Sequence, residues 1–147
     1  MLSVLTLRNA EFSDAAFAYG TREKAMRKYV EQTWGEWNEN QARDQIAEDI
    51  RLLRLNIIEI DAKAAGMMRV DEHSTHLAID QLFLLPDHQG HGIGTTLIHR
   101  ILERARERKL PVKLWVLRVN PAQSLYKRLG FLVVEETAAS LRLQSAA

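Results

Sequence analysis

A glycine-rich turn holds the residues with the clearest chemical potential in this chain. In the stretch DQLFLLPDHQGHGIG, residues 80–94, an apolar extended run ends at Pro86 and the turn opens directly into an amphipathic helix. Backbone N–H groups converge at the start of a helix, where the helix dipole is positive. Glycine lets such a backbone approach a ligand closely. The stretch therefore predicts an anion-binding site.

Two common phosphate-binding patterns do not fit this turn. A P-loop is excluded because no Gly-Lys-Ser/Thr follows the glycines. A dinucleotide fingerprint is excluded by the spacing of Gly90, Gly92 and Gly94, with Thr95 in the place of the third glycine or alanine. The next strand, which runs to Val119, also lacks an acid that could hold a ribose. A turn that only reverses the chain remains an alternative interpretation of these residues.

Two sequence blocks resemble the GNAT superfamily of acyl-CoA-dependent N-acetyltransferases. Gln89, Gly92 and Gly94 match its Q/R-x-x-G-x-G/A motif, between a strand and a helix. The later block VLRVNPAQSLYKRLGF, residues 116–131, has the family's asparagine, alanine, tyrosine and Gly-Phe in the expected order. Together the blocks cover residues 77–134, whereas the N-terminal part carries no sharp motif.

The resemblance implies a mixed α/β fold in a single GNAT-like domain over residues 1–147. A twisted, mixed and mostly antiparallel central sheet of about six or seven strands is expected, together with about four helices. One parallel pair of strands is expected to splay apart and form the cofactor cleft.

The resemblance also implies acetyl-CoA as the co-substrate, without a metal. The N–H groups of the glycine-rich turn would surround the pyrophosphate, and the backbone of residues 82–84 would pair with the pantetheine amides. Asn120 would contact the cofactor arm and could also cap the helix that follows it. The expected cofactor-binding residues are Leu82, Phe83, Leu84, Gln89, Gly90, His91, Gly92, Ile93, Gly94, Thr95, Asn120 and Tyr126.

Tyr126 is the first candidate catalytic residue. The matching tyrosine of the family protonates the departing thiolate of coenzyme A. Tyr126 also lies on an apolar helix face with Ala122, Leu125 and Leu129, so a packing role is the alternative.

Asp80 is the second candidate catalytic residue, as the base that removes a proton from the attacking amine. Several relatives use a glutamate on this strand or on the strand before the asparagine. Here the first strand offers Asp80 and Gln81, and the second has Trp115 and Leu117 at its inward positions. Asp80 could act directly or through water, or could be a hydrogen-bonded surface group.

The acceptor site is predicted around Trp34, Glu36 and Trp37. Two tryptophans and nearby acids could form an aromatic wall that attracts a cationic amine. The alternative is that Trp34 and Trp37 only cover the core beneath a loop. The histidines lack metal-ligand spacing, and the arginines of residues 100–108 alternate with glutamates, which does not indicate a nucleic-acid site.

Hydrophobic periodicity predicts the elements that position these residues. A first strand is predicted at residues 4–8, then a helix capped by Ser13 or Asp14 with a break at Gly20. A second helix is predicted to start at Asn40. Its apolar stripe is predicted to be Ala42, Ile46, Ile50 and Leu53.

After the second helix the apolar residues alternate with a period of two, which is typical of strands. A hairpin over residues 56–70 turns around residues 62–63, and a long strand covers residues 77–85. Strand, helix and strand over residues 77–119 form a right-handed βαβ unit. Asn120 and Pro121 start another helix, with Gln123 at a capping-box position and Gly130 at its end. Residues 131–136 and 140–144 are predicted to be terminal strands.

Composition limits the classes of protein to consider. The chain has 147 residues, no cysteine and a net charge of +1. These values favour a cytoplasmic protein, with neither nucleic acid nor a membrane as partner. A second copy could pair with exposed terminal strands and form a homodimer.

The predicted function is transfer of an acetyl group from acetyl-CoA to a primary amine by direct attack in a ternary complex. The amine would belong to a small molecule or to an exposed protein amine. A non-catalytic acyl-CoA-binding or regulatory module is the alternative, because the family's glutamate is missing.

Overall fold

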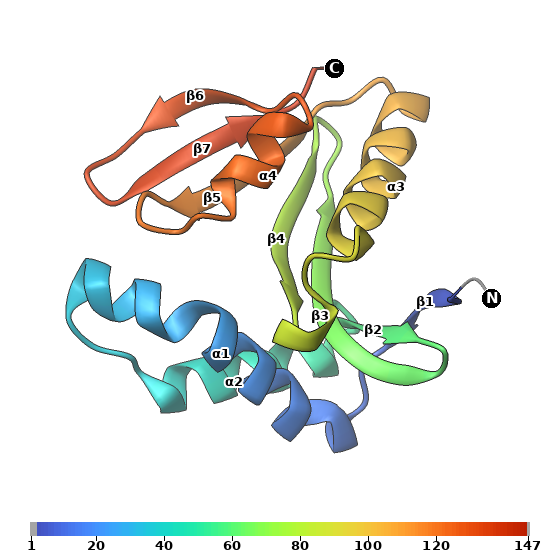
Figure 1. Cartoon of the computed structure of the whole chain (residues 1–147), viewed down its shortest axis with the longest axis vertical. Helices are drawn as coiled ribbons and strands as arrows, with labels where there is room; N and C mark the ends of the chain where they lie inside the picture. The colour runs from blue at the N-terminus through green and yellow to red at the C-terminus, as the bar shows by residue number, and fades with distance from the viewer. Residues whose placement is uncertain (1–2, 147) are drawn as a thin grey trace.

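A seven-stranded sheet with the order β1-β2-β3-β4-β5-β7-β6 forms the centre of the molecule (Figure 1). The computed structural model describes residues 3–146. The strands are β1 (Leu5–Asn9), β2 (Asn56–Ile60), β3 (Lys63–Glu72), β4 (Leu77–Leu84), β5 (Val112–Leu117), β6 (Leu132–Glu136) and β7 (Ser140–Gln144). The helices are α1 (Ala15–Trp34), α2 (Glu39–Arg51), α3 (Ile93–Glu107) and α4 (Gln123–Arg128), with short 3-10 turns η1 (Phe12–Asp14) and η2 (Pro86–His88).

The predicted mixed and mostly antiparallel sheet is confirmed. Among the neighbouring strands of residues 3–146, only β4 and β5 are parallel. Their pairing is limited to Leu77 with Val112 and Ala78 with Lys113. On its other edge β5 pairs with β7 from Lys113 to Leu117, and these two strands turn away from β4 to the left in Figure 1. The expected splayed pair is therefore present.

Two apolar clusters hold the helices against the sheet. Residues of α3 and α4 pack with β4, β5 and β7 in one cluster, which includes Leu97, Tyr126 and Phe131. Residues of α1 and α2 pack with β2 and β3 in the other, which includes Ile46 and Met67. Burying a large apolar side chain stabilises a fold by roughly 1.5–3 kcal/mol. The helical periodicity seen in the sequence thus marks real packing faces.

The N-terminal helices differ from the prediction in three details. Helix α1 continues through Gly20, because a single helical glycine costs only about 1 kcal/mol relative to alanine. Asn38, not Asn40, caps α2, and its side chain accepts a hydrogen bond from the Gln41 N–H at 2.9 Å. Leu53 lies beyond the end of α2 and is 67% exposed, so it is not part of the apolar stripe.

None of the helices in residues 3–146 combines the length and apolar character that a bilayer span requires.

Two glycine substitutions test this packing. Gly66 in β3 pairs with Leu84 in β4, and a Cβ at Gly66 would clash with the backbone carbonyl oxygen of Phe83. Gly66→Ala should therefore lower the free energy of unfolding by roughly 1–3 kcal/mol in urea titrations followed by circular dichroism.

Gly20→Ala is the matched control. Gly20 lies in the interior of α1, and apart from the adjoining residues and the nearby backbone of α1, no atom of residues 3–146 lies within 4 Å of a Cβ added there. The same titration should show a gain of roughly 0.5–1 kcal/mol. Equal changes in both variants would contradict the close β3–β4 approach.

Candidate functional site

The glycine-rich turn presents open backbone at the start of α3. Gly90 and Gly92 both have a φ of 78°, a left-handed conformation that favours glycine. Apart from the adjoining residues, no atom of residues 3–146 lies within 4 Å of a Cβ built at either position. Gly92 is the N-terminal cap residue of α3. A ligand can therefore approach the backbone without meeting side chains here.

The N–H groups of this turn are available to a ligand. In residues 3–146, none of the N–H groups of residues 90–95 donates a hydrogen bond to another protein group. Thr96 is the first residue after the turn whose N–H group donates a hydrogen bond within the protein. Its N–H donates to the Gly92 carbonyl at 3.0 Å, and its hydroxyl donates to the same carbonyl at 2.9 Å. Gln89 donates from Nε2 to the Leu84 carbonyl at 3.0 Å and so ties the turn to β4. Such an N-terminus suits an anion.

The end of β4 connects this turn to the opening beside β5. Leu82 and Leu84 pack against the apolar cluster under α3. Gly94 brings the first turn of α3 close to both β4 and α4, because its added Cβ would lie 3.9 Å from Leu84 Cδ1 and 3.5 Å from Leu125 Cδ2. The turn, the β4 edge and α4 therefore border one continuous region.

Tyr126 lies in α4 at the edge of that region and is 8% exposed. Its ring meets Phe131 edge-on, with the ring centroids 5.4 Å apart. Its hydroxyl has no hydrogen-bond partner in the described part of the chain. Burial raises the pKa of Tyr126 above its ordinary value, so the hydroxyl keeps its proton through the neutral range. Tyr126 thus packs and also retains an unused proton donor.

Asn120 connects the end of β5 to α4 and α1. Its Oδ1 accepts a hydrogen bond from the Ala122 N–H at 2.9 Å, and its Nδ2 lies 3.8 Å from Met26 Sδ. The predicted capping box is wrong. Gln123 is the first residue of α4, and its amide instead donates to the carbonyls of Asn120 and Arg118.

Asp80 occupies a β-bulge. Arg69 pairs with Gln81 and Val70 pairs with Ile79, so Asp80 is the extra residue of β4. Its side chain is 42% exposed, at the point where β4 leaves β5. Bulges turn a side chain out of the regular alternation. This one brings Asp80 to the surface of the opening.

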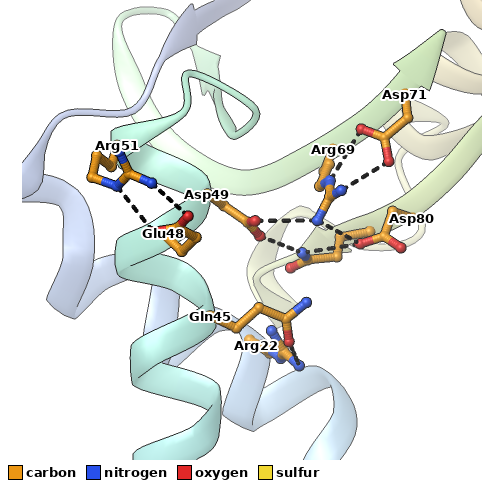
Figure 2. A network of polar contacts seen from close by, with 9 residues as sticks. Arg22, Gln45, Glu48, Asp49, Arg51, Arg69, Asp71 and Asp80 are labelled. Atoms are coloured by element: carbon orange, nitrogen blue, oxygen red, sulfur yellow. Dashed lines mark hydrogen bonds and ion pairs between the residues drawn. The ribbon is translucent and has the colours of Figure 1, made fainter.

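A buried polar network lies behind Asp80 (Figure 2). Arg69 is at its centre, 3.1 Å from Asp49, 3.0 Å from Asp71 and 3.5 Å from Asp80. Gln81 donates to Asp49 at 3.3 Å. Burial opposes the charge of Arg69, but the hydrogen bond to Asp71 and the charges of Asp80 and Asp49 raise the pKa of Arg69. The network fixes the position from which Asp80 projects.

Arg22 of α1 borders the same network in Figure 2. Its Nη2 donates to Gln45 at 3.0 Å, whereas its Nη1 is buried without a partner among the described residues. Burial lowers the pKa of Arg22, while the charges of Asp49 and Asp80 act in the opposite direction. The buried Oε1 of Gln81 also lacks a partner in this part of the chain.

The predicted acceptor residues at the α1–α2 connection do not form one aromatic wall. Trp37 donates from Nε1 to the Tyr19 hydroxyl at 2.9 Å and packs against the α1–α2 cluster. Trp34 is 61% exposed at the end of α1, and Glu36 lines a shallow depression beside Trp37. No ring contact joins Trp34 to Trp37 in residues 3–146. Trp37 therefore covers the core while Trp34 is exposed, and contact of Trp34, Glu36 and Trp37 with an acceptor stays a prediction.

Sequence reasoning missed most of the polar network. Asp49 lies on the buried stripe of α2 between Ile46 and Ile50, and it is 2% exposed. Arg69 lies in the otherwise apolar run AAGMMRV. A charged residue inside an apolar pattern is the signal that could have indicated a buried ion pair.

Comparisons with known proteins agree with this architecture. The model of the acetyltransferase (GNAT) family matches residues 16–131. An uncharacterized N-acetyltransferase of Methanocaldococcus jannaschii is 35% identical over 96 residues, which are 59% of this chain and 42% of that protein. One from Archaeoglobus fulgidus is 39% identical over 72 residues, which are 44% of this chain and 49% of that protein. The chain thus spans less than half the length of these relatives.

Solved structures share the fold at low sequence identity. An acetyltransferase from Thermus thermophilus has a TM-score of 0.76 at 14% identity, over 98% of this chain and 97% of that chain. The PaiA N-acetyltransferase of Thermoplasma acidophilum, solved in complex with coenzyme A, has a TM-score of 0.68 at 18% identity, over 98% and 99%. The family match covers most of the sheet together with the glycine-rich turn and Tyr126, so this chain belongs to the acetyltransferase (GNAT) family.

Proposed function

We propose that the protein transfers an acetyl group from acetyl-CoA to a primary amine, by direct attack in a ternary complex. The observation that carries this proposal is the opening between β4 and β5, which begins beside Asp80 and leads to the glycine-rich turn. Family membership supports acetyl transfer. The coenzyme A complex of the Thermoplasma acidophilum protein of the same fold supports the cofactor.

The cofactor would lie along β4. The pyrophosphate accepts hydrogen bonds from the N–H groups of residues 90–95, at the positive end of α3. The pantetheine amides pair with the backbone of residues 82–84, which has no partner strand on the β5 side. Asn120 contacts the arm from the end of β5. The reactive thioester then comes to rest beside the bulge.

The reaction needs three proton transfers, because the acceptor nitrogen loses two protons and the departing sulfur gains one. Asp80 takes a proton from the acceptor ammonium, directly or through water, and the neutral nitrogen attacks the thioester carbon. The carbon–sulfur bond breaks as the carbon–nitrogen bond forms. Tyr126 gives its proton to the departing sulfur, and its raised pKa keeps that proton in place beforehand. The nitrogen loses its second proton as the amide forms, and this proton returns to the Tyr126 oxygen, while Asp80 releases its proton to solvent. The products are an acetylated amine and free coenzyme A.

The acceptor is the amine of a small molecule or an exposed protein amine. Trp34 and Glu36, both exposed, are proposed to contact the part of the acceptor that is remote from the amine. A second candidate function is a non-catalytic acyl-CoA-binding module. The ion pair between Asp80 and Arg69 favours it, because an aspartate held by an arginine can serve structure alone.

Charge at Gly92 tests the anion site. Asparagine and aspartate both tolerate the left-handed backbone and have the same shape, but only aspartate adds a charge. Gly92→Asp should bind coenzyme A about tenfold or more weakly than Gly92→Asn in calorimetry, because its carboxylate faces the pyrophosphate. Equal affinities of the two variants would place the pyrophosphate elsewhere.

Removal of the Tyr126 hydroxyl tests the proton donor. Tyr126→Phe should lower kcat by about 100-fold while affinity for acetyl-CoA changes little. Thermal unfolding should also change little, since no protein group in the described residues bonds to the hydroxyl. An unchanged kcat would leave Tyr126 as a packing residue.

Substitution of Asp80 separates the two candidate functions. Asp80→Asn should reduce kcat/KM for the acceptor by about 100-fold and leave coenzyme A affinity unchanged. The measurement is release of free coenzyme A across a panel of amines, amino acids and peptides. A wild-type protein that binds acetyl-CoA yet releases none with any acceptor would favour the non-catalytic module.

A further inference from the structure

A pocket opens beside Asp80, on strands β4, β5 and β7. Its volume is about 180 Å³. The residues that line it are His76, Ala78, Ile79, Asp80, Lys113, Leu114, Trp115 and Arg142. It lies at the closed end of the β4–β5 opening, because Ala78 and Lys113 form the last pair between those strands. An arm that follows β4 from the glycine-rich turn would end next to this pocket.

The pocket carries unbalanced positive charge. Neither Lys113 nor Arg142 forms an ion pair with a carboxylate in residues 3–146. The carboxylate of the pocket, Asp80, is already engaged by Arg69. Lys113 and Arg142 therefore line the pocket without an ion pair in the described part of the chain, although Glu135 lies across from Arg142 on β6, and an anion in the pocket would pair with both cations.

Trp115 and His76 define the walls around these cations. Trp115 is 51% exposed, and the Arg142 guanidinium carbon lies 5.9 Å from its ring centroid. Trp115 and Arg142 are paired across β5 and β7, which holds them side by side. Partial burial, together with Lys113, His73 and Arg142, lowers the pKa of His76, so that it is mostly neutral at pH 7. His76 therefore lines the pocket as a neutral imidazole that can form hydrogen bonds, and it adds no third positive charge.

We propose that Lys113 and Arg142 bind an anionic group of the acceptor, so that the preferred acceptor is a primary amine with a carboxylate close to it. The inference rests on the proposed acetyl transfer. Asp80 receives the ammonium, and the carboxylate pairs with the two cations in the same pocket. Free amino acids and peptides with an acidic first residue both carry this chemistry.

Two matched pairs of acceptors test the proposal and separate these sources. Alanine is compared with alaninamide, and a peptide that begins with glutamate is compared with the same peptide beginning with glutamine. Binding to the complex with free coenzyme A is measured by calorimetry, and kcat/KM is measured by coenzyme A release. The charged member of at least one pair should be favoured about tenfold or more in both measurements.

Substitutions of Lys113 and Arg142 test whether these two pocket residues cause the preference for the charged acceptor. Lys113→Gln or Arg142→Gln should reduce the preference about tenfold, and the double variant should abolish it, whereas Arg142→Lys should keep most of it. Lys63→Gln is the control, because this exposed lysine lies at the far end of β3. No charge preference in either pair, or a preference that survives the double variant, would overturn the proposal.

The two measurements distinguish the failure of this inference from the failure of the proposed function. If the protein acetylates acceptors but shows no preference for the charged ones, the proposed acetyl transfer stands and the proposed preference for an anionic acceptor is wrong. If charged acceptors bind more tightly but none is acetylated, the anion-binding pocket stands and the proposed acetyl transfer is wrong.

Discussion

Backbone groups of β4 that have no partner strand are the constraint on which the site depends. After Ala78 the neighbouring strand β5 leaves β4 and continues along β7, which pairs with its other edge. Unpaired N–H and C=O groups inside a protein cost free energy unless another group bonds to them. An extended ligand with amide groups can form hydrogen bonds with these backbone groups along the length of β4, whereas a compact ligand cannot reach all of them. The divergence of the two strands therefore suits an extended ligand such as the proposed cofactor.

The network around Arg69 positions the chemistry at the start of that divergence. Asp49 comes from α2, while Arg69, Asp71 and Asp80 come from β3 and β4. Buried ion pairs add little net stability, but loss of one partner costs roughly 3–5 kcal/mol because it leaves an unpaired buried charge. The network therefore adds little to the free energy of unfolding, but it fixes how α2 sits against the bulge of β4. It fixes where Asp80 meets the opening.

The two sides of the opening carry different chemistry. The side of α3 and α4 offers glycine backbone and a buried tyrosine, which suit a cofactor with a phosphate end and a sulfur end. The pocket on β5 and β7 offers Lys113, Trp115 and Arg142, which suit a charged acceptor. A direct transfer requires both molecules to meet where β4 leaves β5.

Sequence alone determined the elements and the turn, because these depend on local patterns. Alternation predicted the hairpin of β2 and β3, helical spacing predicted an amphipathic helix at α3, and the glycines indicated an open turn before it. The continuity of α1 through Gly20 and the cap at Asn38 were missed, because packing outweighs weak local preferences. Only the tertiary structure brought Arg22 and Asp49 toward Asp80, and Arg142 toward Lys113. These residues are far apart in the chain, and the strand order and the bulge decide which of them meet.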